Sequence, residues 1–328
     1  MNYRSYDDLN RCILANIDVL RTETYDLIVG IPRSGMLPAS IISLELNVDL
    51  TDLGGLINNA TLKRGNTRKK SLKLKNAWDA KKILLVDDSV LSGKSIKQAL
   101  NDIPHDIKRK LKVLCVYSDN WKKENIDFIL EKIPEPRLFQ WNIFHRDILK
   151  LSCVDIDGVL CEDPLPWQND DGHHYEQFLK HAKPKYIPSE VIHSLVTNRL
   201  EKYRSETEKW LKKYNIKYKN LVMLNLASKS DRLEQIDYVG HKRNYYALND
   251  DCLLFIESDI KQAVEISVNT SKPVFCTDAN TLISPNFINA LSKSNAYRNY
   301  RIKYLIKKLI PGIILRWILK LKYRKGRV

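Results

Sequence analysis

Short apolar runs alternate with helical stretches along the whole chain, and this alternation constrains the fold more than any other feature. It predicts α/β domains whose strands lie in parallel sheets. The expected strands cover residues 25–31, 82–86, 112–117, 151–156, 191–196, 221–224 and 253–256. The expected helices cover residues 37–46, 95–101 and 201–214.

The length of 328 residues favours two domains, and either half is long enough to bury a core of its own. A Pro-containing stretch at residues 133–147 is the natural junction between them. We therefore predict a first domain at 1–150, a second at 151–290 and a tail at 291–328.

The positive charge of the chain is concentrated at its C-terminal end. A net charge of +15 would suggest nucleic-acid binding if it were evenly spread. Residues 279–328 contain twelve Lys and Arg and no Asp or Glu, so subtracting those twelve charges leaves only +3 for the rest. The charge therefore characterises the tail and says little about the domains.

Residues 297–328 combine apolar residues at helical spacing with Lys and Arg at the remaining positions. The apolar core of this stretch, 309–319, contains Arg316 and is too short to span a bilayer. The pattern predicts two interfacial helices on an anionic membrane surface. An RNA-binding arm and a helix docked on the protein are the alternatives, but the high apolar content favours a membrane over nucleic acid.

Residues 81–96, KKILLVDDSVLSGKSI, contain the first candidate site. Four apolar residues predict a buried strand that ends at Asp87 and Asp88. A small-residue loop at 92–95 then opens a helix, and loop amides at a helix N-terminus bind anions. Paired carboxylates suit vicinal hydroxyls, so the segment suits a sugar phosphate. The simpler interpretation is a strand, turn and helix with a polar turn.

A Walker A phosphate loop is excluded here, because that motif needs Gly five residues before Gly93 and the position is Asp88. The segment instead resembles the signature for 5-phosphoribosyl diphosphate (PRPP) in type I phosphoribosyltransferases. The resemblance implies that Asp87 and Asp88 hold the ribose 2- and 3-hydroxyls. The residues that it implies for the 5-phosphate are Ser92, Gly93, Lys94 and Ser95.

Two further segments extend this resemblance over the first 150 residues. Residues 27–39, LIVGIPRSGMLPA, are similar to the diphosphate loop of the family, which implies that Arg33, Ser34 and Gly35 contact the leaving group. Residues 62–75 form a basic run, which by itself is an ordinary solvated charge run. In the family a mobile basic loop closes over the diphosphate, and the residues that could do so here are Lys63, Arg64, Arg68 and Lys69.

One position departs from the purine-specific members of that family. They place an Asp just before the phosphate loop, where it assists the base nitrogen, and here the position is Leu91. This difference disfavours a purine acceptor. An alcohol acceptor would need another base to take its proton, and the sequence does not identify one.

Residues 151–160, LSCVDIDGVL, contain the second candidate site. A strand there delivers Asp155 and Asp157, which we expect on the same side of a pleated backbone, with Gly158 permitting the turn beyond them. Two such carboxylates suit Mg²⁺ with a bound phosphate, and one of them can attack phosphorus.

This segment resembles motif one of haloacid-dehalogenase-type (HAD) phosphatases. The resemblance implies that Asp155 is the nucleophile and Asp157 the general acid/base. It also implies a phosphate-binding Thr197 near Arg199, although any one such residue alone could be an ordinary surface residue. The implied motif-three lysine is Lys242, with Lys229 as second candidate. The implied Mg²⁺ ligands are Asp155, Asp157 and Asp259, with Glu257 as second candidate.

Only about forty residues separate motif one from Thr197, which is short for a large cap domain. This stretch includes Asp171, His173 and His174, which could form a metal site. A polar loop over the mouth of the phosphatase site is the favoured interpretation. A small cap leaves the site open to a bulky substrate.

In combination, these features resemble dual-domain ribofuranosyltransferases of bacterial polysaccharide assembly. The resemblance implies PRPP as donor, a lipid-linked glycan as acceptor and Mg²⁺ in both domains. With six scattered cysteines, no apolar signal region and the basic tail, we expect a cytoplasmic protein at the inner face of the cytoplasmic membrane. Nucleotide salvage and a PRPP-sensing RNA-binding regulator are the alternatives, and the oligomeric state is left open.

Overall fold

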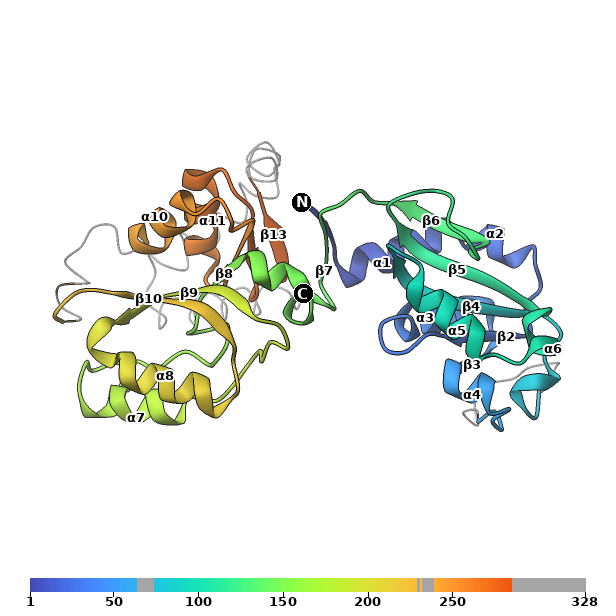
Figure 1. The fold of residues 1–328 in the computed structure, drawn as a ribbon, viewed down its shortest axis with the longest axis horizontal. Helices are drawn as coiled ribbons and strands as arrows, with labels where there is room; N and C mark the ends of the chain where they lie inside the picture. The colour runs from blue at the N-terminus through green and yellow to red at the C-terminus, as the bar shows by residue number, and fades with distance from the viewer. Residues whose placement is uncertain (64–73, 229–230, 232–238, 285–328) are drawn as a thin grey trace, which may run out of the picture. The chain divides into compact units, whose positions relative to one another are not determined.

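The computed structural model describes residues 1–63, 74–228, 231 and 239–284 (Figure 1). The chain divides into two compact units, Met1–Ile143 and Phe144–Val328, and each is described by itself. No helix in the described ranges is long and apolar enough to cross a membrane. The predicted tail, residues 291–328, lies outside the described residues.

The first unit is built on a parallel sheet of five strands in the order β3-β2-β4-β5-β6. A second, two-stranded parallel sheet pairs β1 with β7. The strands are β1 (Asn2–Arg4), β2 (Leu27–Gly30), β3 (Asp49–Asp52), β4 (Ile83–Val90), β5 (Leu111–Ser118), β6 (Phe128–Lys132) and β7 (Arg137–Phe139). The helices are α1 (Tyr6–Ala15), α2 (Ile17–Arg21), α3 (Met36–Leu46), α4 (Leu53–Ile57), η1 (Ala77–Asp79), α5 (Lys94–Asp102) and α6 (His105–Lys108). The short 3₁₀ helix η2 (Ile143–His145) begins at the last residue of this unit.

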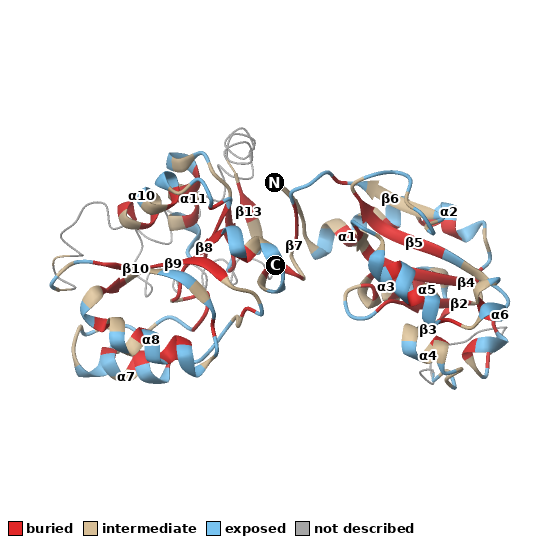
Figure 2. Ribbon diagram, in the orientation of Figure 1, coloured by how far each residue is buried: buried red, intermediate tan, exposed pale blue. Residues whose placement is uncertain are grey.

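Both faces of the five-stranded sheet are covered, and this explains why its central strands are continuously apolar. Alternate residues of a strand point to opposite faces. Leu84 and Val86 therefore pack with α1, α2 and α3, whereas Ile83 and Leu85 pack with α4, η1, α5 and α6. Figure 2 shows these central strands as buried.

Strand β4 differs from its prediction at its carboxyl end. The strand does not end at Asp87 but continues to Val90, because Ser89 pairs with Tyr117 and Val90 with Ser118 of β5. The predicted junction at residues 133–147 contains β7, which pairs with β1 in the first unit.

The second unit contains a sheet in the order β10-β9-β8-β11-β12-β13, parallel except for the antiparallel pair β12 and β13. The strands are β8 (Ser152–Val154), β9 (Ile192–Leu200), β10 (Tyr218–Leu224), β11 (Leu254–Glu257), β12 (Val274–Cys276) and β13 (Thr281–Ile283). The helices are η3 (Asp147–Leu151), α7 (His173–His181), η4 (Glu201–Tyr203), α8 (Arg204–Lys213), α10 (Gly240–Leu248) and α11 (Ile260–Thr270).

The carboxyl ends of β8, β9 and β11 meet at one edge of this sheet, as expected for neighbouring parallel strands. Helices α10 and α11 pack over one side of the sheet, and α7 packs against α8 (Figure 1). Two predicted boundaries shift: β8 ends at Val154, and the helix expected at 201–214 begins with a 3₁₀ turn.

Candidate functional site

The first unit places two buried carboxylates within strand β4. Asp87 is 8% exposed and Asp88 is 3% exposed. The backbone N–H of Asp88 donates to Oδ1 of Asp87 at 2.9 Å, and the indole Nε1–H of Trp141 donates to Oδ2 of Asp88 at 2.6 Å. These two donors do not saturate the four carboxylate oxygens, so further donors or a cation would stabilise the ionised forms of the acids.

Burial, followed by repulsion from Asp88, raises the pKa of Asp87 from 3.8 to about 8. Two adjacent carboxylates in a dry environment cannot both ionise without cost. A ligand that brings hydroxyl donors or a positive charge would lower this cost. The pair is therefore suited to a sugar diol or a cation.

The predicted diphosphate loop lies directly against these acids. A Cβ added to Gly35 would meet the backbone oxygens of Ile31 and Val86 at 2.6 and 2.7 Å and Oδ1 of Asp87 at 2.9 Å. Only a glycine allows the loop to approach this closely. Gly35 therefore brings the loop that carries Arg33 and Ser34 close to Asp87. Arg33 is exposed and donates to Oδ1 of Asn142 at 3.4 Å.

The predicted 5-phosphate loop follows β4 and opens helix α5. Gly93 is the N-cap and has φ +73°, the left-handed region that favours glycine. The hydroxyl of Ser92 accepts from the backbone N–H of Lys94 at 3.4 Å, and Ser92, Lys94 and Ser95 are exposed. The loop and the first turn of α5 can therefore present amides to an anion.

Two residues near this site were not predicted from the sequence. Trp141 reaches Asp88, and both terminal nitrogens of Arg137 donate to the carbonyl of Val90 at 3.1 Å, just before the phosphate loop. Each contact joins residues about fifty positions apart, so no local pattern indicates it. In the predicted basic clamp, Lys63 is exposed, while Arg64, Arg68 and Lys69 lie outside the described residues.

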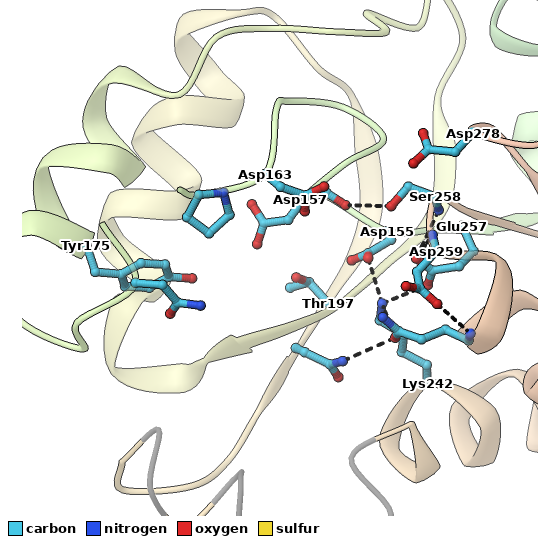
Figure 3. Close-up of a pocket in the computed structure, with 14 residues that line it drawn as sticks. Asp155, Asp157, Asp163, Tyr175, Thr197, Lys242, Glu257, Ser258, Asp259 and Asp278 are labelled. Atoms are coloured by element: carbon cyan, nitrogen blue, oxygen red, sulfur yellow. Dashed lines mark hydrogen bonds and ion pairs between the residues drawn. The ribbon is translucent and has the colours of Figure 1, made fainter. Parts of the chain in front are cut away.

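The second unit contains a cavity of about 430 Å³ at the edge where β8, β9 and β11 end (Figure 3). Thr197, which is 1% exposed, lines it from β9, and Lys242 lines it from α10. The lining contains six carboxylic acids, which are Asp155, Asp157, Asp163, Glu257, Asp259 and Asp278.

Lys242 joins two of these acids by short ion pairs. Its Nζ lies 2.6 Å from Oδ2 of Asp155 and 2.7 Å from Oε2 of Glu257, and it donates to Gln262 at 3.1 Å. All three charged side chains are buried. Lys242, predicted as the motif-three lysine, is therefore brought to Asp155; Lys229 lies outside the described residues.

The charges around Lys242 are strongly coupled. Burial alone would lower the pKa of Lys242, but Asp155 and Glu257 raise it overall, which favours the ammonium form. Burial raises the pKa of Asp155 to about 8, with Lys242 opposing and Glu257 and Asp157 adding to the rise. We assign an ion pair, since the short contact between Nζ and Oδ2 favours opposite charges.

Asp157 lines the same cavity but has a different partner. Arg199 Nη2 lies 2.7 Å from Oδ1 of Asp157, and its Nε lies 3.1 Å from Oδ2. Arg199 is 1% exposed and also donates to Thr207 at 3.3 Å. Although burial would lower the pKa of Arg199, Asp157 raises it overall, so the guanidinium stays charged and holds the carboxylate.

Asp155 and Asp157 do not alternate on a pleated strand as predicted, because β8 ends at Val154 and both follow it. Gly158 turns the chain with φ +75°, and a Cβ there would meet Ser258 Oγ at 2.2 Å. The turn, rather than the pleat, directs both carboxylates into the cavity (Figure 3).

The predicted metal ligands line this cavity without converging. Oδ1 of Asp259 accepts from two backbone amides and caps α11. Both oxygens of Glu257 accept hydrogen bonds, one from Lys242 and one from the amides of Ser258 and Asp259. Within the part of the chain that the structure describes, no three His, Cys, Asp or Glu side chains are placed to hold a metal ion.

Comparison with known proteins identifies one domain. The family described as phosphoribosyl transferase domain matches residues 5–148, so a phosphoribosyltransferase domain occupies that part of the chain. No curated protein matches the chain.

Several solved structures are similar to part of the chain. A purine phosphoribosyltransferase from Pyrococcus horikoshii is 21% identical, with 42% of this chain and 92% of that chain covered and a TM-score of 0.31. A xanthine-guanine-hypoxanthine phosphoribosyltransferase from Helicobacter pylori is 22% identical, with coverages of 43% and 93% and a TM-score of 0.32.

Proposed function

From the phosphoribosyltransferase domain at residues 5–148, we propose that the chain adds ribofuranose to a glycan in two steps. The first unit transfers a 5-phosphoribosyl group from PRPP to an acceptor hydroxyl and releases diphosphate. The second unit then removes the 5-phosphate as a HAD-type phosphatase. The observation that carries the proposal is that one chain contains two separate sites suited to phosphate chemistry, the β4 carboxylates with their loops and the acidic cavity around Lys242.

In the transfer step, the bond from ribose C1 to diphosphate breaks and a bond from C1 to the acceptor oxygen forms. Asp87 and Asp88 accept hydrogen bonds from the ribose hydroxyls, and the amides at residues 92–95 bind the 5-phosphate. Arg33 binds the diphosphate, which leaves with the electron pair of the broken bond. The acceptor hydroxyl gives its proton to a base. Inversion at C1 of the α donor produces a β linkage.

In the phosphatase step, the carboxylate of Asp155 attacks phosphorus and the bond from phosphorus to the ribose oxygen breaks, while Asp157, which must enter this step as the carboxylic acid, gives its proton to that oxygen. Water, deprotonated by Asp157, then attacks the aspartyl phosphate and releases inorganic phosphate. Lys242 offsets charge on the phosphoryl oxygens, and Thr197 donates a hydrogen bond to them. Arg199 holds Asp157 in place through its two-point contact.

The donor chemistry of both sites fits Mg²⁺, which prefers oxygen ligands. The six acids that line the cavity outnumber their cationic partners Lys242, Arg199 and Lys185, so they would repel a phosphate dianion, and a divalent cation would offset that repulsion. In the second unit, the carboxylates of Asp155 and Asp259 and the backbone carbonyl of Asp157 would hold it. Glu257 is the second candidate, and both of its oxygens accept hydrogen bonds, as both oxygens of Asp155 do. In the first unit, the carboxylates of Asp87 and Asp88 would be the Mg²⁺ ligands.

A glycan acceptor is favoured by Leu91, which is 48% exposed where a purine-specific enzyme would place an acid. The basic apolar tail, outside the described residues, favours an acceptor that is linked to lipid at the inner face of the cytoplasmic membrane.

The proposal is tested by incubating the full chain with PRPP and Mg²⁺ and either glycans or free nucleobases. We expect diphosphate release that requires a glycan, with a pentose added to that glycan by mass. Asp87→Ala combined with Asp88→Ala should abolish transfer and leave hydrolysis of a supplied 5-phosphoriboside intact. Turnover of nucleobases alone would establish nucleotide salvage instead, and PRPP binding without diphosphate release would establish a regulator.

A further inference from the structure

A second cavity lies next to the acidic cavity of the second unit. It measures about 410 Å³, a size typical of small-molecule sites, and the segment 162–183 forms it. Asp163 lines both cavities, so the two are neighbours at this residue. Asp163 is also one of the acids near Asp157, since Asp157 contributes to the raised pKa of Asp163 after burial. A substrate phosphate beside Asp155 would therefore have its remaining part within reach of the second cavity.

One wall of this second cavity is apolar and open to solvent. Trp167 is 62% exposed, more than any other tryptophan in the described ranges, and Leu165 is 53% exposed. Phe178 and Ala182 of the same cavity are buried. Single exposed apolar residues are common on protein surfaces, but here two of them line one cavity beside a candidate active site.

The rest of the wall is polar and nearly neutral in charge. The carboxamides of Gln168 and Gln177 line it, together with two acids, two histidines and one lysine. Side chains of this kind can donate to and accept from hydroxyl groups. The Oε1 of Gln168 accepts from the backbone N–H of Leu165 at 2.9 Å, which holds the turn carrying Trp167.

We propose that this second cavity binds neutral sugar units of the glycan that carries the 5-phosphoribosyl group. The inference rests on the proposed phosphatase function of the neighbouring cavity. The C–H face of a sugar ring packs on the electron-rich face of Trp167, while the carboxamides bind its hydroxyls. This would position a phosphoriboside through its glycan and not only through its phosphate.

Two observations favour a sugar over other ligands. An anion would meet Glu162 and Asp163, so a second phosphate is disfavoured. A flat nucleobase favours a slot between parallel rings, but the ring of His174 stands edge-on to Trp167, at 81° and 5.8 Å between centroids. His174 is held in this orientation by Asp170, whose Oδ2 lies 2.7 Å from its Nδ1.

The test uses synthetic probes, so it does not depend on the transfer step. One probe is a 5-phospho-β-ribofuranoside of a neutral hexose disaccharide, and the other is methyl 5-phospho-β-ribofuranoside. Binding of each to full-length Asp155→Asn protein is measured by calorimetry, and hydrolysis is measured with the parent protein. We expect the disaccharide probe to bind about tenfold more tightly than the methyl probe, since stacking on an aromatic ring contributes at most about that factor.

Trp167→Ala should remove this difference and raise KM for the disaccharide probe about tenfold, while KM for the methyl probe stays unchanged. Trp121→Ala is the matched control, because Trp121 is 58% exposed and belongs to the first unit. Equal binding of both probes, or tighter binding of a nucleoside 5′-monophosphate that Trp167→Ala abolishes, would overturn the inference. If neither probe is hydrolysed but the binding preference persists, the sugar site stands and the phosphatase proposal fails.

Discussion

Replacing Lys242 with Met should destabilise the second unit, because it leaves two buried carboxylates without their cation. Asp155 and Glu257 are 5% and 0% exposed, and their contacts to Nζ are 2.6 and 2.7 Å. Removing one partner of a buried ion pair costs about 3–5 kcal/mol, because the other charge stays buried and unpaired. We expect a loss of this size in the free energy of unfolding of Lys242→Met at pH 8.

The loss should depend on pH in a defined direction. Without Lys242, burial raises the pKa of Asp155 in the folded state further, so protonation of Asp155 relieves the cost as the pH falls. The destabilisation should therefore be smaller at pH 5 than at pH 8. Adding Glu257→Gln should recover part of the stability at pH 8, because Gln keeps an acceptor for the amides of Ser258 and Asp259.

Urea unfolding of the full chain, followed by circular dichroism, measures both effects. Lys209→Met is the matched control, because Lys209 is exposed on α8 and should change stability by no more than about 0.5 kcal/mol. The reasoning is refuted if Lys242→Met unfolds at the same urea concentration as the parent. It is also refuted if the loss is as large at pH 5 as at pH 8.

Three further substitutions test individual contacts. The raised pKa of Asp87, from 3.8 to about 8, means that its stabilising contribution is complete below about pH 3.8 and lost as the pH rises to about 8. The stability of Asp87→Asn relative to the parent should therefore rise progressively between pH 4 and 8, as measured by thermal unfolding. A stability difference that does not change with pH would contradict the raised pKa of Asp87. Gly35→Ala should lower phosphoribosyl transfer by about tenfold or more, since its Cβ would displace backbone next to Asp87; Gly54→Ala, whose Cβ meets only Asp52 at 3.5 Å, should retain activity. Arg199→Lys should lower kcat for phosphate release about tenfold or more with little change in KM, because Lys cannot make the two-point contact to Asp157; unchanged kcat would show that this contact does not position Asp157.

The sequence predicts the parts of both sites that depend on strand ends and turns. Apolar runs followed by Asp87 and Asp88, or by Asp155 and Asp157, place acids near one edge of a parallel sheet whatever the exact strand length. Glycines 35, 93 and 158 are likewise visible in the sequence, and the structure explains each by a close approach or a positive φ.

Partners that come from distant segments could not be predicted. Trp141 donates a hydrogen bond to Asp88, 53 positions earlier in the sequence, and Arg199 donates to Asp157, 42 positions earlier. Only the packed fold brings these residues together. Asp259 is different, because an Asp directly before a helix is a common N-cap and that pattern is visible locally. The cap accounts for one of its oxygens, and Oδ2 accepts no hydrogen bond from any described residue.

The most direct test of the two-step account is the mass of the product made by Asp155→Asn. Full-length protein with this substitution is supplied with PRPP, Mg²⁺ and a glycan that the parent modifies. The account predicts a glycan that carries ribose 5-phosphate, one phosphate group heavier than the product of the parent protein. The same dephosphorylated product from both proteins would contradict the assignment of Asp155 and the coupling of the two sites.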